Sequence, residues 1–144
     1  MSSVTTPRPP AGGAYPYRGR VTPDYSPEGD RNPDPGEIVW AWVPFEEDDT
    51  VGKDRPLVVI GRGERPGQFV AFMLSSRDHA GDPGWIAVGT GSWDPERRQS
   101  WARVDRPLGI DDGGVRREGA VLTEERFLDL LVRARQERNG IEVD

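Results

Sequence analysis

The sequence predicts a small β-barrel or strongly curved sheet with one α-helix packed on it near the C-terminus. Two patterns support this fold class. Several short runs rich in β-branched and aromatic residues follow one another between Gly, Asp and Pro turns, which is typical of small barrels. Apolar residues take up helical spacing only near the end of the chain. With 144 residues, the chain has room for one domain and a modest core.

The first 35 residues are expected to lie outside that core as a disordered tail rich in Pro and Gly. Eight of the 14 prolines fall here, and aliphatic side chains are almost absent. Such a segment cannot bury enough surface to offset the entropy lost on ordering. The alternative is a short recognition segment built on Tyr15, Tyr17 and Tyr25. The folded domain is predicted to span residues 36–144.

Residues 37–45, EIVWAWVPF, are predicted to form the first strand. Ile38, Trp40 and Trp42 alternate on one face, and the residues between them are also apolar. Because both faces are apolar, we expect the strand to be covered on both sides. The two tryptophans are therefore expected in the core rather than stacked on nucleic-acid bases.

Further strands are predicted along the rest of the β-rich region. A polar loop over 46–54 precedes a second strand that opens at Pro56, where the first residue needs no ladder donor. A third strand is expected over 68–74. Weaker strand patterns follow at 85–88 and 100–104.

The last element is predicted to be an amphipathic helix that begins after Thr123. This threonine can cap the helix N-terminus, and Asn139-Gly140 is a stop signal. Acidic residues follow the cap and arginines occupy the last turns, as the helix dipole favours. The apolar stripe consists of Phe127, Leu130, Leu131 and Ala134.

Composition excludes several kinds of function. The chain has no cysteine and one histidine, so neither a disulfide framework nor a thiolate metal site is possible, and no metal is expected. No run reaches the about 18 apolar residues of a membrane span, and the N-terminus lacks an apolar signal region, which predicts a soluble, cytoplasmic protein. The net charge of −6 falls on residues 36–144 and argues against indiscriminate nucleic-acid binding, although it permits a local basic cleft.

The stretch GKDRPLVVIG contains the first candidate site residue, Arg55. Together with Lys53 and Asp54, it directly precedes an apolar strand. An arginine at such a position could pair with Asp54 or with the acidic loop EEDD as a weak surface ion pair. Alternatively, a rigid strand could hold the guanidinium for a functional role.

Four motifs in order resemble the PemK/MazF-type toxins of bacterial type II toxin–antitoxin pairs, in an actinobacterial-like variant. In that family a Gly-acid-aliphatic-aromatic strand precedes a variable loop and an Arg-Pro-aliphatic strand, and the third strand ends in Thr or Ser. The resemblance covers roughly residues 36–140. The motifs are GEIVWAWVPF, GKDRPLVVIG, FVAFMLSS and SWARVDRPLGID.

The resemblance implies an SH3-like barrel that forms a homodimer and cuts single-stranded RNA without a metal or other cofactor, held in check by a cognate antitoxin. By position, the functional arginine of the family falls on Arg55. Its hydroxyl residue falls on Ser75, where the family usually has threonine. A glutamate that many members carry before the arginine falls near Thr50, beside Asp49. This departure removes the loop carboxylate from its usual place.

RNA cleavage through the 2′-hydroxyl needs alignment of the attack, charge stabilisation and the management of two protons. Arg55 suits charge stabilisation, because its planar guanidinium matches phosphate oxygens, but it is a poor general base. Ser75 could bond the same phosphate, or it could only satisfy the backbone. The acid and base roles stay open among Asp54, Asp78 and His79, and the histidine could instead serve the turn DHAGDPG.

A second group of residues offers contacts for RNA or for another protein. Lys53 precedes the candidate arginine, and Trp93 and Trp101 lie among the neighbouring arginines Arg97 and Arg98. Aromatic rings among arginines suit a single-strand channel, and they equally suit a protein interface. The alternative function is therefore an inactive domain of the same fold that binds a protein or a nucleic acid without cutting it.

Overall fold

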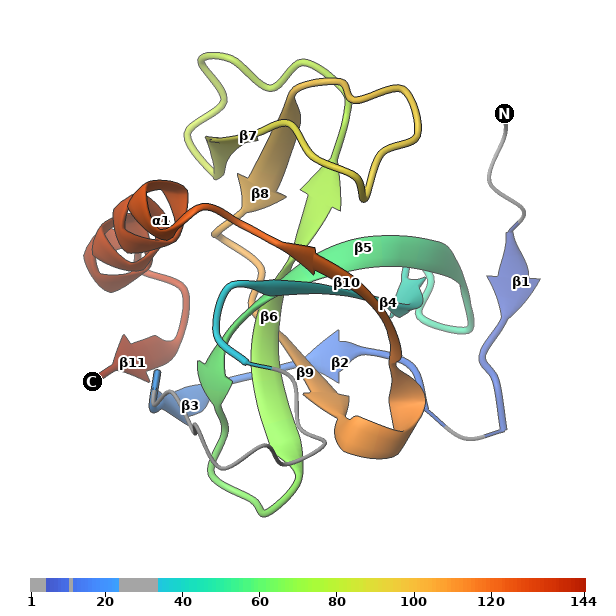
Figure 1. Cartoon of the computed structure of the whole chain (residues 1–144). Coiled ribbons are helices and arrows are strands. Elements are labelled where there is room, and N and C mark those ends of the chain that lie inside the picture. The colour runs from blue at the N-terminus through green and yellow to red at the C-terminus, as the bar shows by residue number, and fades with distance from the viewer. Residues whose placement is uncertain (1–4, 11, 24–33) are drawn as a thin grey trace.

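The computed structural model describes residues 5–10, 12–23 and 34–144 (Figure 1). The described chain is mainly β with one α-helix near the C-terminus, which confirms the predicted fold class at that level. None of its helical segments is long and apolar enough to cross a bilayer. Tyr25 of the possible recognition segment lies outside the described residues.

Most strands belong to one sheet, in the order β10-β4-β5-β6-β8-β7, with β1 also on β5 and β9 between β6 and β2. A second, two-stranded sheet joins β3 and β11 in parallel. The elements are β1 (Thr6–Pro7), β2 (Tyr15–Pro16), β3 (Gly19–Val21), β4 (Glu37–Pro44), β5 (Val51–Arg62), β6 (Gln68–Ser75), β7 (Trp85–Gly89), β8 (Ser100–Arg103), β9 (Leu108–Asp111), the 3₁₀ turn η1 (Asp112–Gly114), β10 (Arg116–Val121), α1 (Glu124–Gln136) and β11 (Ile141–Val143).

The main sheet bends strongly but does not close into the predicted barrel. No pairing among the described strands joins the outer strands β10 and β7. β5 and β6 pair as far as Leu57 opposite Met73, and β6 then pairs through Leu74 and Ser75 with β8 on its other edge. The two strands therefore separate. In the described sheet, residues 53–55 of β5 pair only with β4.

β4, β6 and the second half of β5 are buried on both faces, as expected for the first of these strands. One apolar cluster includes Ile38 of β4, Phe72 of β6 and Leu130 of α1, so the helix covers this face. The other cluster includes Val39 and Leu57 and extends to β9. Alternation along the strands divides these side chains between the two clusters.

β5 begins well before its predicted start at Pro56. It runs from Val51, so the predicted loop over 46–54 is shorter and Arg55 lies within the strand rather than at its mouth. Proline is tolerated inside a strand where one edge is unpaired. The separation of β5 from β6 supplies such an edge at this point.

The N-terminal segment differs from the predicted disordered tail wherever it is described. β2 pairs with β9 and β3 pairs with β11, and Ala14, Tyr17 and Val21 are buried. Further along the sheet, Arg8 lies over the Trp42 ring, and the indole N–H of Trp42 donates to the carbonyl of Thr6 at 3.3 Å. Backbone pairing and a few buried side chains thus order a segment whose composition indicated none.

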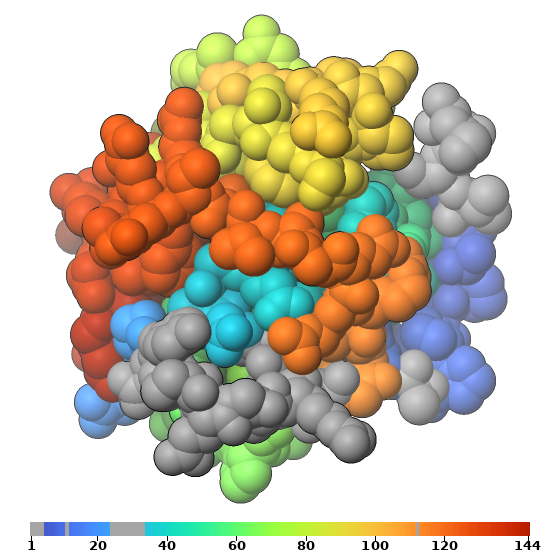
Figure 2. Space-filling view, viewed as in Figure 1, coloured from blue at the N-terminus to red at the C-terminus, as the bar shows by residue number. Residues whose placement is uncertain are grey.

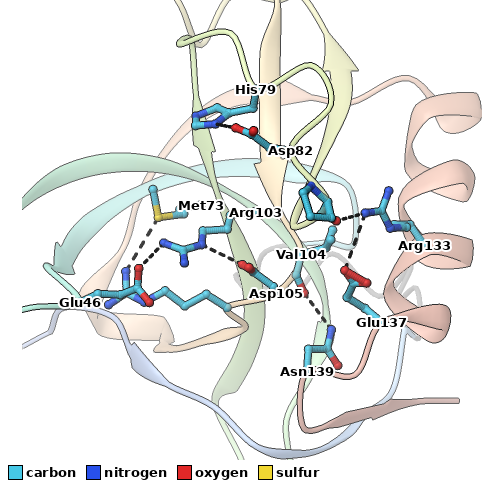
Figure 3. Close-up of polar contacts among 12 residues, drawn as sticks. Glu46, Met73, His79, Asp82, Arg103, Val104, Asp105, Arg133, Glu137 and Asn139 are labelled. Carbon is cyan, nitrogen blue, oxygen red and sulfur yellow. Dashed lines mark hydrogen bonds and ion pairs between the residues drawn. The ribbon is translucent and has the colours of Figure 1, made fainter.

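The helix confirms its predicted start. The Thr123 hydroxyl accepts a hydrogen bond from the Arg126 N–H, and α1 ends at Gln136, ahead of the predicted stop. The Asn139 side chain then donates to the Val104 carbonyl at 2.9 Å, which directs the chain into β11 (Figure 3).

Three strands of the C-terminal half were not predicted, namely β9, β10 and β11. β10 is an exposed edge strand with charged residues, as edges often are. Figure 2 shows β10 and the turn before it, in orange, crossing the cyan residues of β4, and the pairing places Arg116 opposite Trp40.

Candidate active site

A cleft of about 770 Å³ opens where β5 and β6 separate. It brings together seven of the ten residues predicted for the site: Lys53, Asp54, Arg55, Ser75, His79, Trp93 and Arg98. Asp78, Arg97 and Trp101 do not line it. The predicted site therefore assembles largely from residues distant in sequence, across the gap in the sheet.

Arg55 is a half-buried cation that has no ion-pair partner among the described residues. It lies opposite Ala41 of β4 and on the same face as Leu57, at the end of an apolar cluster. Burial, followed by repulsion from Arg106, Arg77 and Arg103, lowers the pKa of Arg55 below its ordinary value. A buried cation surrounded by like charges is unfavourable until an anion binds to it.

The alternative ion pairs considered for Arg55 are not formed. Asp54 instead pairs with Arg116 at 2.7 Å, and Arg116 lies over the Trp40 ring. In the acidic loop, Glu46 pairs with Arg103 at 2.6 Å (Figure 3). These carboxylates are thus committed to other cations.

Ser75 lies at the end of β6, where its hydroxyl serves the backbone and its side chain also faces the cleft. Its Oγ accepts a hydrogen bond from the Arg77 N–H at 3.2 Å, so the hydroxyl serves the backbone. The same side chain lines the cleft. Continuing the register of Leu57 and Met73 by one pair on the same face places Ser75 across from Arg55.

His79 also serves a turn and faces the cleft. Its carbonyl accepts from the Asp82 N–H at 2.9 Å, and its Nδ1 lies 3.0 Å from the Asp82 carboxylate (Figure 3). The imidazole stacks on Trp85, with ring centroids 3.6 Å apart and planes 3° apart. By contrast, Asp78 accepts from the Ala80 N–H in the same turn and lies outside the cleft.

The second group of predicted contacts is only partly available to a ligand. Trp93 is 6% exposed and donates to the Ser100 hydroxyl at 2.9 Å, so it belongs to the core beneath the cleft. Arg98 pairs with the buried Asp94 at 2.8 Å. Trp101 is half-buried on β8, outside the cleft.

Several cleft residues were missed as site residues in the sequence, among them Trp40, Trp85 and Arg77. Trp40 was assigned to the core but is half-buried in the cleft wall, where Arg116 lies over its ring. Trp85 and Arg77 were not singled out. The sequence signal for Arg77 was its alternation with Ser75 beyond the strand end, which has meaning only once the partner strand is known.

No cluster of three or more His, Cys, Asp or Glu side chains suited to a metal ion occurs in the part of the chain that the structure describes.

A family model described as PemK-like, MazF-like toxin of type II toxin–antitoxin system matches residues 34–136. The chain belongs to this family. The match contains every residue that lines the cleft, whereas β1, β2, β3 and β11 lie outside it. No curated protein gives a significant match. Membership of the PemK-like, MazF-like toxins implies an antitoxin partner.

Proposed function

We propose that this chain is a toxin that acts as a metal-independent endoribonuclease on single-stranded RNA. The observation that carries the proposal is Arg55, a half-buried guanidinium without a carboxylate partner among the described residues, in a cleft of a PemK-like, MazF-like toxin. A phosphate oxygen is the ligand that such a guanidinium suits best.

Arg55 binds the scissile phosphate and stabilises the charge that builds up on its oxygens. Ser75 assists from across the cleft. Its oxygen already accepts from the Arg77 N–H, so its own hydrogen is free to donate to a phosphate oxygen. The two strands that carry these residues are rigid parts of the sheet, which favours a fixed geometry.

Of the three candidates for proton transfer, His79 has the most support. When Nδ1–H donates to Asp82, the lone pair of Nε2 can accept a proton. The 2′-hydroxyl proton moves to Nε2 as O2′ bonds to phosphorus, the P–O5′ bond breaks, and the leaving O5′ takes a proton from water. The hydroxide left behind then takes the proton from Nε2, which restores the neutral imidazole. The products are a 2′,3′-cyclic phosphate and a 5′-hydroxyl. Asp54 is held by Arg116, and Asp78 lies outside the cleft.

The decisive experiment is incubation of a long unstructured RNA with purified protein in EDTA, beside Arg55→Ala. We expect discrete cuts ending in cyclic phosphate, and their loss in a variant that keeps the circular dichroism of the wild type. If folded wild-type protein leaves several diverse RNAs intact, the enzyme proposal fails, and the cleft belongs to a binding module.

The proton acceptor is tested separately with His79→Gln and Asp82→Asn. Loss of the imidazole should lower kcat by about 10²–10⁴-fold, the usual contribution of general acid–base catalysis. Asp82→Asn should lower kcat less, because the ring stays stacked on Trp85 but loses the carboxylate that selects its tautomer. Unchanged kcat in His79→Gln would rule out the assignment.

We also propose that the toxin is a homodimer inhibited by its antitoxin, on the strength of its family alone. Light scattering on purified protein gives the mass in solution. A monomer across the concentrations that support cleavage would exclude the dimer from the active form.

A further inference from the structure

Three cations lie close together in the cleft. Lys53 and Arg55 are two residues apart on β5 and therefore lie on the same face of that strand. Arg77 follows directly after the end of β6, and its charge acts on both Lys53 and Arg55. Lys53, Arg55, Ser75 and Arg77 all line the cleft. The cleft thus holds a second pair of basic side chains, Lys53 and Arg77, beside Arg55.

No carboxylate neutralises the second pair within the described residues. Burial, followed by repulsion from Arg55 and Arg77, lowers the pKa of Lys53. The carboxylates that line the cleft, Asp54 and Asp94, are already bonded to Arg116 and Arg98. The repulsion inside this group is relieved only when anions enter it.

The backbone of Arg77 is held in place by the site itself. The Ser75 hydroxyl accepts the Arg77 N–H, which ties the first residues after β6 to the strand end. Residues two apart on a strand are separated by about 6.7 Å. This step is comparable to the distance between neighbouring phosphates in an extended RNA strand.

We propose that Lys53 and Arg77 form a second phosphate subsite, which takes the phosphate next to the scissile one. The proposal rests on the proposed RNA cleavage and specifies the substrate as an oligonucleotide with at least two phosphates in the cleft. Contacts to a phosphate that does not react strengthen ground state and transition state equally, so they lower KM and leave kcat unchanged.

The test compares Arg77→Gln with Arg62→Gln, an exposed arginine at the far end of β5 whose side chain has no bond to another described residue. The substrate is a DNA oligonucleotide with one ribonucleotide at a linkage first located in a long RNA. Variants carry a neutral methylphosphonate on either side of the cleaved linkage. Binding of the all-deoxy oligonucleotide, which cannot react, is followed by fluorescence anisotropy over a salt series.

We expect Arg77→Gln to raise KM about tenfold with kcat within twofold, and Arg62→Gln to behave like wild type. One methylphosphonate should impose the same penalty on wild type and no further penalty on Arg77→Gln. For Arg77→Gln, the slope of log affinity against log salt should be smaller in magnitude than that of wild type by about 0.7, the value for one phosphate contact to a single strand. Thermal unfolding confirms that both variants are folded.

The outcomes separate the two proposals. If wild type cleaves RNA but Arg77→Gln matches Arg62→Gln in KM and salt slope, the second subsite is wrong and the proposed function stands. If Arg77→Gln lowers kcat and leaves KM unchanged, Arg77 acts on the scissile phosphate, and the proposal of a separate subsite is again wrong. If wild type neither cleaves RNA nor binds the deoxy oligonucleotide, both proposals fail.

Discussion

Replacing Arg55 by methionine should stabilise the protein while it abolishes cleavage. Methionine keeps a long apolar stem beside Leu57 and removes the charge. In the native state that charge is half-buried and repelled by Arg106, Arg77 and Arg103. Replacing a residue that stabilises the fold should lower the free energy of unfolding. The sign of the change in that free energy therefore distinguishes a functional arginine from a structural one.

The magnitude follows from the three repulsions. One like charge at about 10 Å costs roughly 1.7 kcal/mol at an effective dielectric constant near 20. A screening length of about 8 Å in 0.15 M salt reduces this to about 0.5 kcal/mol. Pairing of Arg103 with Glu46, side-chain rearrangement and exposure lower the sum of the three repulsions, so we expect a gain of about 1 kcal/mol. For a chain of this size the unfolding midpoint should rise by about 2–4 °C.

The assay is thermal unfolding followed by circular dichroism in low, physiological and 1 M salt, beside Arg98→Met as a matched control. Arg98 lines the same cleft but pairs with buried Asp94. Its loss leaves that carboxylate without its cation and should lower the unfolding midpoint. The gain from Arg55→Met should shrink as salt rises. A lower midpoint for Arg55→Met at low salt would refute the reasoning, since it would show that the arginine has a stabilising partner.

Three other perturbations test separate parts of the structure. Ser75→Thr should keep activity, because it keeps the oxygen that accepts the Arg77 N–H, whereas Ser75→Ala should raise KM and lower kcat in steady-state assays. Val21→Ala, at a fully buried position outside the family match, should cost about 1.5–3 kcal/mol in urea unfolding, while Val132→Ala on the exposed face of α1 should cost under about 0.5. If Val21→Ala has the same urea unfolding curve as wild type, the N-terminal segment does not contribute to the stability of the fold. Bonding to Arg98 lowers the pKa of Asp94, so the stabilising effect of this carboxylate is present above its unfolded-state pKa and is lost as pH falls. In chemical unfolding, the stability difference between wild type and Asp94→Asn should therefore narrow as pH drops through the acid range. A difference that widens would contradict this.

The sequence predicted the elements whose formation depends on residues close together along the chain. The alternation of EIVWAWVPF and the cap at Thr123 each have a direct physical cause in neighbouring residues, and β4 and α1 agree with them. The prediction of a disordered N-terminal segment failed for the described residues, because composition indicates side-chain burial and takes no account of backbone pairing. β2 and β3 are ordered by the edges of β9 and β11, which were themselves not predicted.

The site divides in the same way. Arg55 and Ser75 were found through the resemblance, and the structure brings both to one cleft. Trp40, expected in the core, lies in the cleft wall beside Arg116, whereas Trp93, expected to contact a ligand, is enclosed by the core. A sequence cannot show what covers each of these side chains. Arg77 lies just after β6, and its closeness to Lys53 and Arg55 of β5 depends on contact between segments distant in sequence.

The separation of β5 and β6 has a consequence for how the activity could diversify. One wall of the gap is β5, whose apolar second half is packed between two apolar clusters. The other wall continues into the turn that contains His79 and Asp82, which is largely exposed and tolerates insertions. Arg55 and the exposed turn thus lie on different walls of the cleft. Under the proposed function, the exposed residues of this turn other than His79 and Asp82 can vary while Arg55 and its strand stay unchanged.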